Sequence, residues 1–206
     1  MKKFLSVFLF VFFISSCSYS LAAPTFNAST GQINTPSADV MRDGQFSVGF
    51  YNLQHSRKVG MFILGVTPKL EVGFRRNVYS DSSDNTISAK YSIVKEDILK
   101  PGFAIGYEQG TGSEGDSFYG AVSKRLIWGI RLHVGIGNNK YEHGFIALEK
   151  SIKKIKFANI GASNVILEYD GKHFNCGIRA SVAKNLKVDL GIKDDRGYFG
   201  ISYTKL

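Results

Sequence analysis

Residues 164–204 read NVILEYDGKHFNCGIRASVAKNLKVDLGIKDDRGYFGISYT, and their hydrophobicity alternates almost throughout. Within 174–182, apolar residues occupy the even positions and small, polar or charged residues occupy the odd positions. A β-strand sends successive side chains to opposite faces. The stretch therefore predicts four consecutive strands joined by short turns. One face of these strands is apolar, and the other mixes charged residues with glycine and serine.

The same alternation runs through the chain from Gln45 to Lys150 and indicates about eight further strands. No segment has a helical period long enough to predict a helix, and regularly spaced short strands indicate an all-β sandwich or barrel. The strand number is even and the strands are about nine residues long, as in outer-membrane barrels. Open sheet edges cannot be hydrated within lipid. We therefore predict an antiparallel up-and-down transmembrane β-barrel of about 12 strands.

The connections sort into two kinds, as expected of such a barrel. Loops rich in Ser, Asp and Gly at 80–85 and 110–116, together with 138–142, are assigned to the outside. Tight turns at 67–69 and 183–185 are assigned to the periplasmic side. The connection 151–161 is the exception, because it is long and basic yet falls on the periplasmic side.

The charged residues of the strands share a face with glycine and serine, and in a membrane barrel this face lines the lumen. We expect mutually paired and solvated side chains there, and a selective pore is the sharper alternative. The lumen-lining candidates are Glu71, Arg75, Lys90, Glu108, Arg131, Glu168, Arg179, Lys187 and Asp189.

The N-terminus is typical of a secretory signal, with Lys2 and Lys3 before the apolar run 4–14. This divides the chain into a signal peptide (1–22), a lead-in segment rich in Pro, Ser, Thr, Asn and Gly (23–44) and a barrel domain (45–206). Two processing sites remain open. Cleavage before Ala23 would remove Cys17, whereas a lipobox reading would leave Cys17 acylated at the new N-terminus.

The chain has 26 Lys and Arg against 17 Asp and Glu, giving a net charge of +9. No basic helix or basic–aromatic module gathers these charges, so nucleic acid is not expected as a partner. The run of lysines at 150–156 is expected to be a solvated connection. Cys176 lies in an apolar row, so we expect a buried and inert thiol.

Two segments resemble the YjbH-type outer-membrane proteins of exopolysaccharide operons. The first is TGQINTPSA at 30–38, followed by Asp43-Gly44 and the strand motif FSVGF. The second is EYDGKHFN at 168–175, followed by Gly177. The resemblance implies an outer-membrane barrel, often a lipoprotein, linked to polysaccharide export or surface assembly. It thereby implies outer-membrane lipid and periplasmic polysaccharide-export proteins as partners. The typical members of that family are several times longer.

Two other classes of function stay open as alternatives. An outer-membrane lipid-modifying enzyme would need a serine, a histidine and an acid in mutual reach. The four histidines are scattered and none lies in a nucleophile elbow, so we expect no catalytic residues, no cofactor and no metal; His133 beside Arg131 is the one histidine to test. A soluble or lipid-anchored periplasmic β-barrel or sandwich is the third class, but its interior would bury these charges with little compensation.

Overall fold

The computed structural model describes residues 23–54, 57–110, 115–152 and 161–205. Their strands are β1 (Phe46–Leu53), β2 (Arg57–Thr67), β3 (Leu70–Val78), β4 (Ser83–Val94), β5 (Gly102–Glu108), β6 (Ser117–Arg125), β7 (Ile130–Gly137), β8 (Phe145–Ile152), β9 (Ser163–Tyr169), β10 (Phe174–Ala183), β11 (Leu186–Lys193) and β12 (Arg196–Lys205). Two 3₁₀ turns, η1 (Ile127–Gly129) and η2 (Asn139–Tyr141), interrupt the connections. Within these ranges no helix is long and apolar enough to cross a membrane.

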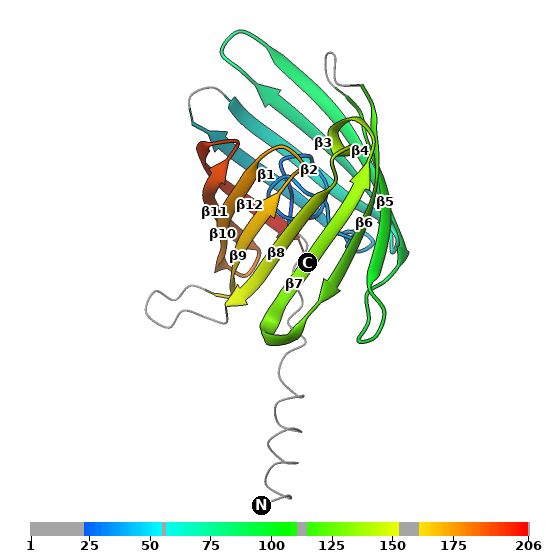
Figure 1. The fold of residues 1–206 in the computed structure, drawn as a ribbon. Coiled ribbons are helices and arrows are strands. Elements are labelled where there is room, and N and C mark those ends of the chain that lie inside the picture. Colours follow the sequence, from blue (N-terminus) through cyan, green and yellow to red (C-terminus); the bar gives the residue numbers. More distant parts are fainter. Residues whose placement is uncertain (1–22, 55–56, 111–114, 153–160, 206) are drawn as a thin grey trace, which may run out of the picture.

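The twelve strands form one closed barrel in which every strand pairs with its sequence neighbours (Figure 1). Closure comes from antiparallel pairing of the first and last strands, which runs from Phe46 opposite Lys205 to Leu53 opposite Tyr198. No edge is left open, so every strand has two partners for its backbone amides and carbonyls. The predicted fold class, an antiparallel up-and-down barrel of about 12 strands, is confirmed.

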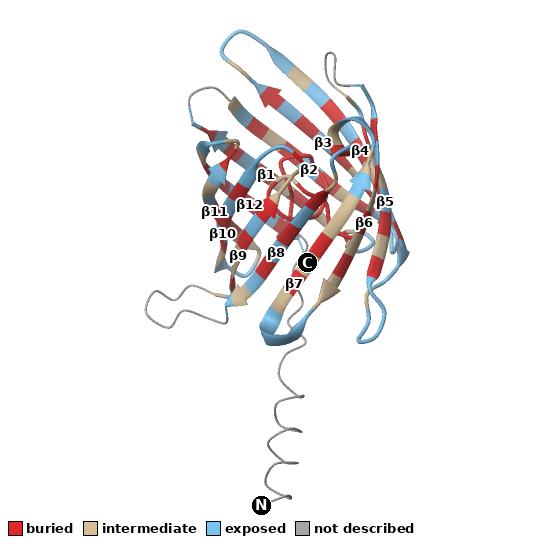
Figure 2. Ribbon diagram, viewed as in Figure 1, coloured by how far each residue is buried: buried red, intermediate tan, exposed pale blue. Residues whose placement is uncertain are grey.

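Buried and exposed residues alternate along each strand and give the barrel wall its banded appearance (Figure 2). The outward positions hold large apolar side chains, such as Phe50, Phe118 and Leu190, which are 63%, 57% and 55% exposed. The row that contains Cys176 belongs to this outer face, and its thiol is exposed. The expectation of a buried cysteine is therefore wrong, because the apolar face of this sheet is its outside.

The connections lie at two ends of the barrel. At the end that carries Phe46 and Lys205, here called the termini end, adjacent strands are joined at 68–69, 95–101, 126–129 and 184–185. The seven-residue connection at 95–101 is additional to the predicted turns. At the opposite end, β4 already begins at Ser83, so the predicted loop at 80–85 shrinks to 79–82, and the loop 138–142 contains η2. Most of the connection 151–161 lies outside the described residues, as do the predicted signal peptide and Cys17.

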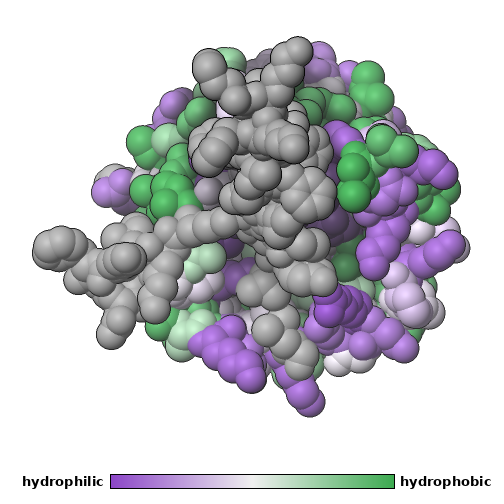
Figure 3. Space-filling model, turned by 90° about the horizontal axis from the view of Figure 1, so that it is seen from below, coloured by the Kyte–Doolittle hydropathy of each residue, from purple (hydrophilic) through white to green (hydrophobic). Residues whose placement is uncertain are grey.

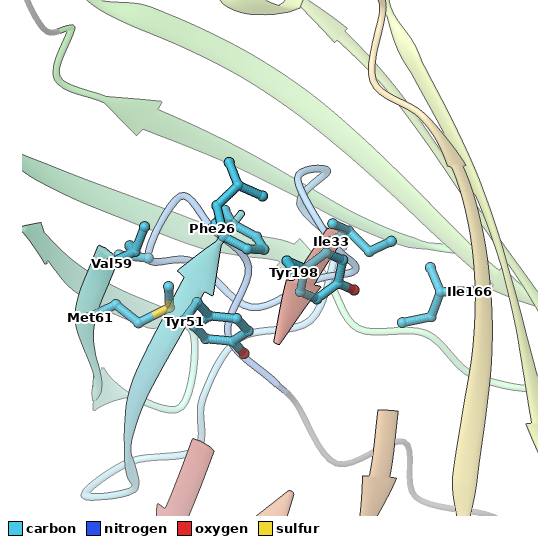
Figure 4. Close-up of a cluster of buried hydrophobic side chains, with 9 residues drawn as sticks. Phe26, Ile33, Tyr51, Val59, Met61, Ile166 and Tyr198 are labelled. Atoms are coloured by element: carbon cyan, nitrogen blue, oxygen red, sulfur yellow. The ribbon is translucent and has the colours of Figure 1, made fainter. Parts of the chain in front are cut away.

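The segment 23–44 enters the barrel and coils inside it, as the blue trace in Figure 1 shows. From Ala23 to Met41 nearly every residue is buried. Phe26 packs against Tyr51 and Tyr198, with ring centroids 4.9 and 5.2 Å away. Figure 4 shows the cluster that these side chains form with Ile33, Val59, Met61 and Ile166. The larger of two hydrophobic clusters therefore lies between the lead-in segment and the inner wall, and the smaller one joins η2 to β6 and β8.

Candidate functional site: the lumen and its plug

Residues 23–41, here called the plug, form a compact coil held by their own backbone. The Phe26 amide donates to the Ile33 carbonyl (2.8 Å), and the Gly31 amide donates to the Ala23 carbonyl (3.0 Å). A Cβ on Gly31 would lie 2.3 Å from the Thr35 carbonyl oxygen, so the coil needs glycine at this point. The plug has few strand or helix hydrogen bonds, so many of its polar groups need partners on the barrel wall.

Glu71 of β3 is the first of two carboxylates that meet this need. Its side chain accepts hydrogen bonds from the amides of Thr30 and Met41, both at 2.8 Å. The Lys90 ammonium lies 3.1 Å from the same carboxylate and donates to the Thr30 carbonyl at 2.6 Å. Glu71 and Lys90 are each 1% exposed. This buried ion pair therefore holds one side of the plug, with the opposite charges compensating each other.

Glu168 of β9 is the second carboxylate. It accepts three successive plug amides, those of Ile33 (3.0 Å), Asn34 (2.9 Å) and Thr35 (3.0 Å). The Thr35 hydroxyl donates to it at 2.8 Å, as does the Asn175 side-chain amide. Backbone amides that converge on one anion solvate its charge strongly. The plug therefore wraps around Glu168 much as a protein loop wraps around a bound anion.

Two arginines hold the carbonyl side of the plug. Arg179 of β10 donates to the carbonyls of Pro24, Gly31 and Gln32 at 3.0–3.2 Å, while Asp189 of β11 accepts from its Nε at 2.5 Å. Arg75 of β3 donates to the Phe26 carbonyl at 3.1 Å. A guanidinium carries several donors in fixed directions, which suits it to several carbonyls at once.

Asp39, close to the end of the plug, pairs with Arg131 of β7. The guanidinium contacts both carboxylate oxygens of Asp39 and also binds Glu96 from the connection 95–101. Burial alone would raise the pKa of the Asp39 carboxyl, but the charge of Arg131 outweighs this effect and lowers the pKa to about 2. The carboxyl is thus held as an anion, and its ionisation is coupled to docking of the plug.

A serine, a histidine and a glutamate come together on the inner wall, a set that the sequence did not predict. Ser123 Oγ lies 2.8 Å from His133 Nδ1, and His133 Nε2 lies 3.6 Å from Glu149. The acid is on Nε2 and the serine on Nδ1, the reverse of a serine hydrolase. The Ala38 amide donates to Ser123 Oγ at 2.8 Å, and Gln32 contacts both His133 and Glu149. The group therefore serves as a docking cluster for the plug.

Glycines let the plug approach the wall closely. A Cβ on Gly73 of β3 would lie 1.7 Å from the Ala28 carbonyl oxygen, and one on Gly65 of β2 would lie 2.0 Å from the Arg42 carbonyl oxygen. Neither position has room for any larger residue unless the plug moves. These inward glycines explain why glycine shares a face with charged residues in the sequence.

All nine lumen-lining candidates lie inside the barrel, each at most 8% exposed. Glu71, Arg75, Lys90, Arg131, Glu168 and Arg179 bind the plug directly. Asp189 holds Arg179, and Glu108 binds Lys140 and Tyr141 of η2 at 2.9 and 2.5 Å. Lys187 is likewise buried. Mutual pairing is found for Glu71 with Lys90 and for Arg179 with Asp189, but the lining is buried and not open to solvent.

The sequence did not indicate Ser123 and Glu149 as plug contacts or Asn175 as a partner of Glu168, and His133 was considered for catalysis alone. Each occupies an inward position of its strand, so the alternation that found the nine candidates could have found these four as well. Nothing in that alternation indicates what they contact, because the plug itself has no periodic pattern.

A possible metal cluster was also not predicted. Asp170, His173 and Asp194 place one ligand atom each within 4.8 Å of one another at the end opposite the termini. Asp170 already accepts the amides of Lys172 and His173 and the side-chain amides of Asn34 and Asn175. These hydrogen bonds show that the Asp170 carboxylate stabilises the turn and binds the plug, which explains its position without a metal ion.

The two segments that resemble the YjbH-type proteins meet in the structure. Asn34 and Thr35 belong to the first segment, and Glu168, Asp170 and Asn175 belong to the second. The Glu168 bonds described above join them, and Asn34 also donates to Asp170 at 2.8 Å. The two motifs are therefore two halves of one docking site, although they are more than 130 residues apart in the chain.

Known proteins resemble this chain in fold and in the sequence that forms the docking site. The chain is similar in fold to a KdgM porin, with a TM-score of 0.53 at 10% sequence identity over 79% of this chain and 98% of the other. No curated protein sequence matches the chain. The model of the YjbH family, described as exopolysaccharide biosynthesis protein YbjH, matches residues 26–174, a range that includes most of the plug and Glu168. The chain therefore belongs to the YjbH family.

Proposed function

We propose that this protein is an outer-membrane β-barrel of an exopolysaccharide export or surface-assembly system, and that its own plug keeps its lumen closed. Its role is then structural, as a closed barrel that anchors partner proteins of that system at the membrane. The observation that carries the proposal is an arrangement opposite to that of a soluble β-barrel. The outer face is apolar, and the polar inner face is filled by residues 23–41.

Membrane placement is supported by the outward side chains. Leucine, isoleucine, valine and phenylalanine cover the outside of the barrel along all twelve strands. The strands have 7–12 residues, a range centred near the roughly 9–11 residues of a tilted span. A soluble protein rarely exposes such a large apolar surface. Membership of an exopolysaccharide family supports the link to polysaccharide, and the porin-like fold is consistent with the outer membrane.

A closed structural barrel is favoured over an open pore and over an enzyme. An open pore would require water-exposed charges in the lumen, yet the charges here are bound to the plug. A hydrolase would require a reachable nucleophile, yet Ser123 and His133 are each 0% exposed beneath the plug.

The direct test is conductance across a planar lipid bilayer. We expect the purified wild-type protein to show little steady conductance. Gly73→Val should open the channel, because its side chain would occupy the site of the Ala28 carbonyl. Gly60→Ala is the matched control, because this outward glycine on the neighbouring strand has no contact nearer than 3.8 Å. Steady conductance of the wild-type barrel equal to that of Gly73→Val would contradict the proposal.

A further inference from the structure

Two neighbouring connections at the termini end present large apolar side chains to their surroundings. In the connection 95–101, Ile98 and Leu99 are 93% and 87% exposed, and in η1, Ile127 and Trp128 are 67% and 69% exposed. These four residues, and the less exposed Leu126 beside them, lie beyond the strands and are therefore not part of the apolar outer wall of the barrel. Apolar side chains gathered in this way mark an interaction surface.

Polar contacts hold the connection 95–101 against the end of β6, which leads into η1. The Lys124 ammonium donates to the carbonyls of Asp97 (3.0 Å) and Ile98 (2.8 Å), and Glu96 accepts the Arg125 amide. The Asp97 carboxylate accepts the amides of Leu99 and Lys100 at 2.8 and 2.6 Å. The apolar side chains are thus displayed on a turn with defined hydrogen bonds.

The turn at η1 is also strained. Trp128 has a φ of 58°, which non-glycine residues seldom adopt, and Gly129 follows with a φ of 70°. The Lys150 ammonium donates to the Trp128 carbonyl and so helps to hold this conformation. Strain of this kind persists where the surrounding structure imposes it, and it often marks a functional position. Here it turns a tryptophan away from the barrel.

Cations surround the apolar side chains. Lys95, Lys100 and Lys150 are exposed beside them, and Lys124 and Arg125 are half-buried. Of the two acids in these connections, Glu96 is already bound to Arg131. Figure 3 views the molecule from this end and shows hydrophobic and hydrophilic residues side by side on the rim. Tryptophan with flanking lysines is the composition of proteins at a membrane–water interface, and clustered lysines attract anionic headgroups.

We propose that this surface, defined by Ile98, Leu99, Ile127, Trp128 and the five cations around them, binds anionic phospholipid in the leaflet at the termini end. The apolar side chains insert among the acyl chains next to the headgroups. Lys95 and Lys100 contact the phosphates, while Lys124 and Lys150, whose ammonium groups bind backbone carbonyls, add positive charge to the surface. The inference rests on the proposed membrane placement. Continuity favours lipid over a protein partner, because Ile93 and Val94 at the end of β4 extend the apolar outer face directly into the connection.

Trp128 is the only tryptophan of the chain, so its fluorescence reports on this surface alone. The experiment reconstitutes the full mature protein in phosphatidylcholine vesicles that contain either brominated phosphatidylglycerol or brominated phosphatidylcholine at the same mole fraction. We expect the brominated phosphatidylglycerol to quench Trp128 more strongly. Lys95→Gln combined with Lys100→Gln should lower the ratio of the two quenching efficiencies at least about twofold.

The matched control is Lys69→Gln combined with Lys184→Gln, which removes two exposed lysines from other turns at the same end. It should leave the ratio unchanged. Equal quenching by both lipids in the wild-type protein would overturn the preference for anionic headgroups. Quenching of Trp128 by aqueous iodide but by neither lipid would overturn membrane contact and would leave the surface to a protein partner.

Gel mobility of unboiled and boiled samples from the same vesicles separates this inference from the proposed function. A heat-modifiable barrel whose Trp128 is not quenched by lipid contradicts the lipid-binding surface alone. A protein that is washed off the vesicles contradicts the membrane placement itself.

Discussion

Glu71 and Glu168 perform the same task on opposite walls of the barrel with different neighbours. They lie on β3 and β9, which are half-way round the closed ring from each other, and each accepts plug amides. Glu71 has the Lys90 ammonium 3.1 Å away. Glu168 is bound by neutral donors, namely amides, a hydroxyl and the Asn175 side chain. The comparison shows that a buried carboxylate can be stabilised by a counter-ion or by converging dipoles. Substitution of the two glutamates should therefore lower the free energy of unfolding by different amounts.

The largest effect is expected from Glu71→Gln, because it leaves the Lys90 ammonium buried without its counter-charge. Breaking a buried ion pair in this way costs about 3–5 kcal/mol. The measurement is urea unfolding of the protein in detergent, followed by gel mobility. Combining Glu71→Gln with Lys90→Met should recover part of the loss. A double variant as unstable as the sum of both single variants would show that the ion pair is not coupled.

Glu168→Gln should lower the free energy of unfolding by less, about 1.5–3 kcal/mol. It removes the negative charge from several hydrogen bonds, but it leaves no buried cation without a counter-ion. The same unfolding experiment measures it. If Glu168→Gln destabilised the protein more than Glu71→Gln, the distinction between counter-ion and dipole stabilisation drawn above would be wrong.

Low pH should weaken docking of the plug by protonating the carboxylate of Asp39, a plug residue. The pKa of Asp39 is lowered in the folded protein to about 2 from an ordinary value of 3.8, so the pair with Arg131 stabilises docking above about pH 4. This stabilisation is lost as the pH falls from about 4 towards 2. We expect the unfolding temperature to be unaffected by Asp39 between pH 7 and pH 5 and to drop below pH 4. Asp39→Asn should be less stable at pH 7 and should lose that part of the acid response; an unchanged response would exclude Asp39 as its source.

The smallest effect is expected from a pair that does not touch the plug. Lys140 of η2 binds Glu108 at 2.9 Å and is partly open to solvent. Lys140→Met should cost about 1 kcal/mol, because water can replace the partly exposed ammonium and the Tyr141 hydroxyl still donates to the buried Glu108 carboxylate, and it should leave conductance as low as in the wild-type protein. Conductance that rises in Lys140→Met would mean that closure extends beyond the plug contacts described here.

The fold could be predicted because β-barrel strands carry a strict two-residue period. Phe174, Ile178 and Leu190 point outwards and Asn175, Arg179 and Asp189 point inwards, as alternation alone requires. The same rule placed the nine charged residues in the interior. Cys176 was misassigned because alternation gives the face of a residue, but does not say whether that face is the core or the outside.

The plug could not be predicted from periodicity, since residues 23–41 have none. The segment looks like a polar linker, and its burial depends on partners such as Glu71, Arg179 and Glu168 that are 40 to 150 residues away. Its resemblance to the YjbH proteins did single out 30–38 and 168–175. What the sequence could not show is that these segments bind each other.

The most direct test of the central claim, that residues 23–41 fill the lumen, is a disulfide between plug and wall. A Cβ on Gly102 would lie 3.2 Å from Ala38 Cβ, so a shift of a few tenths of an ångström brings the pair to the roughly 3.5–4.5 Å found in disulfides. In a Cys176→Ser background, Ala38→Cys combined with Gly102→Cys should cross-link almost completely when membranes are oxidised before detergent is added. The non-reduced and reduced forms would be separated by gel mobility. We expect cross-linking to be lost when Gly73→Val is added, because the valine would displace the plug. Failure of the cysteines to cross-link in an otherwise folded, heat-modifiable barrel would contradict it.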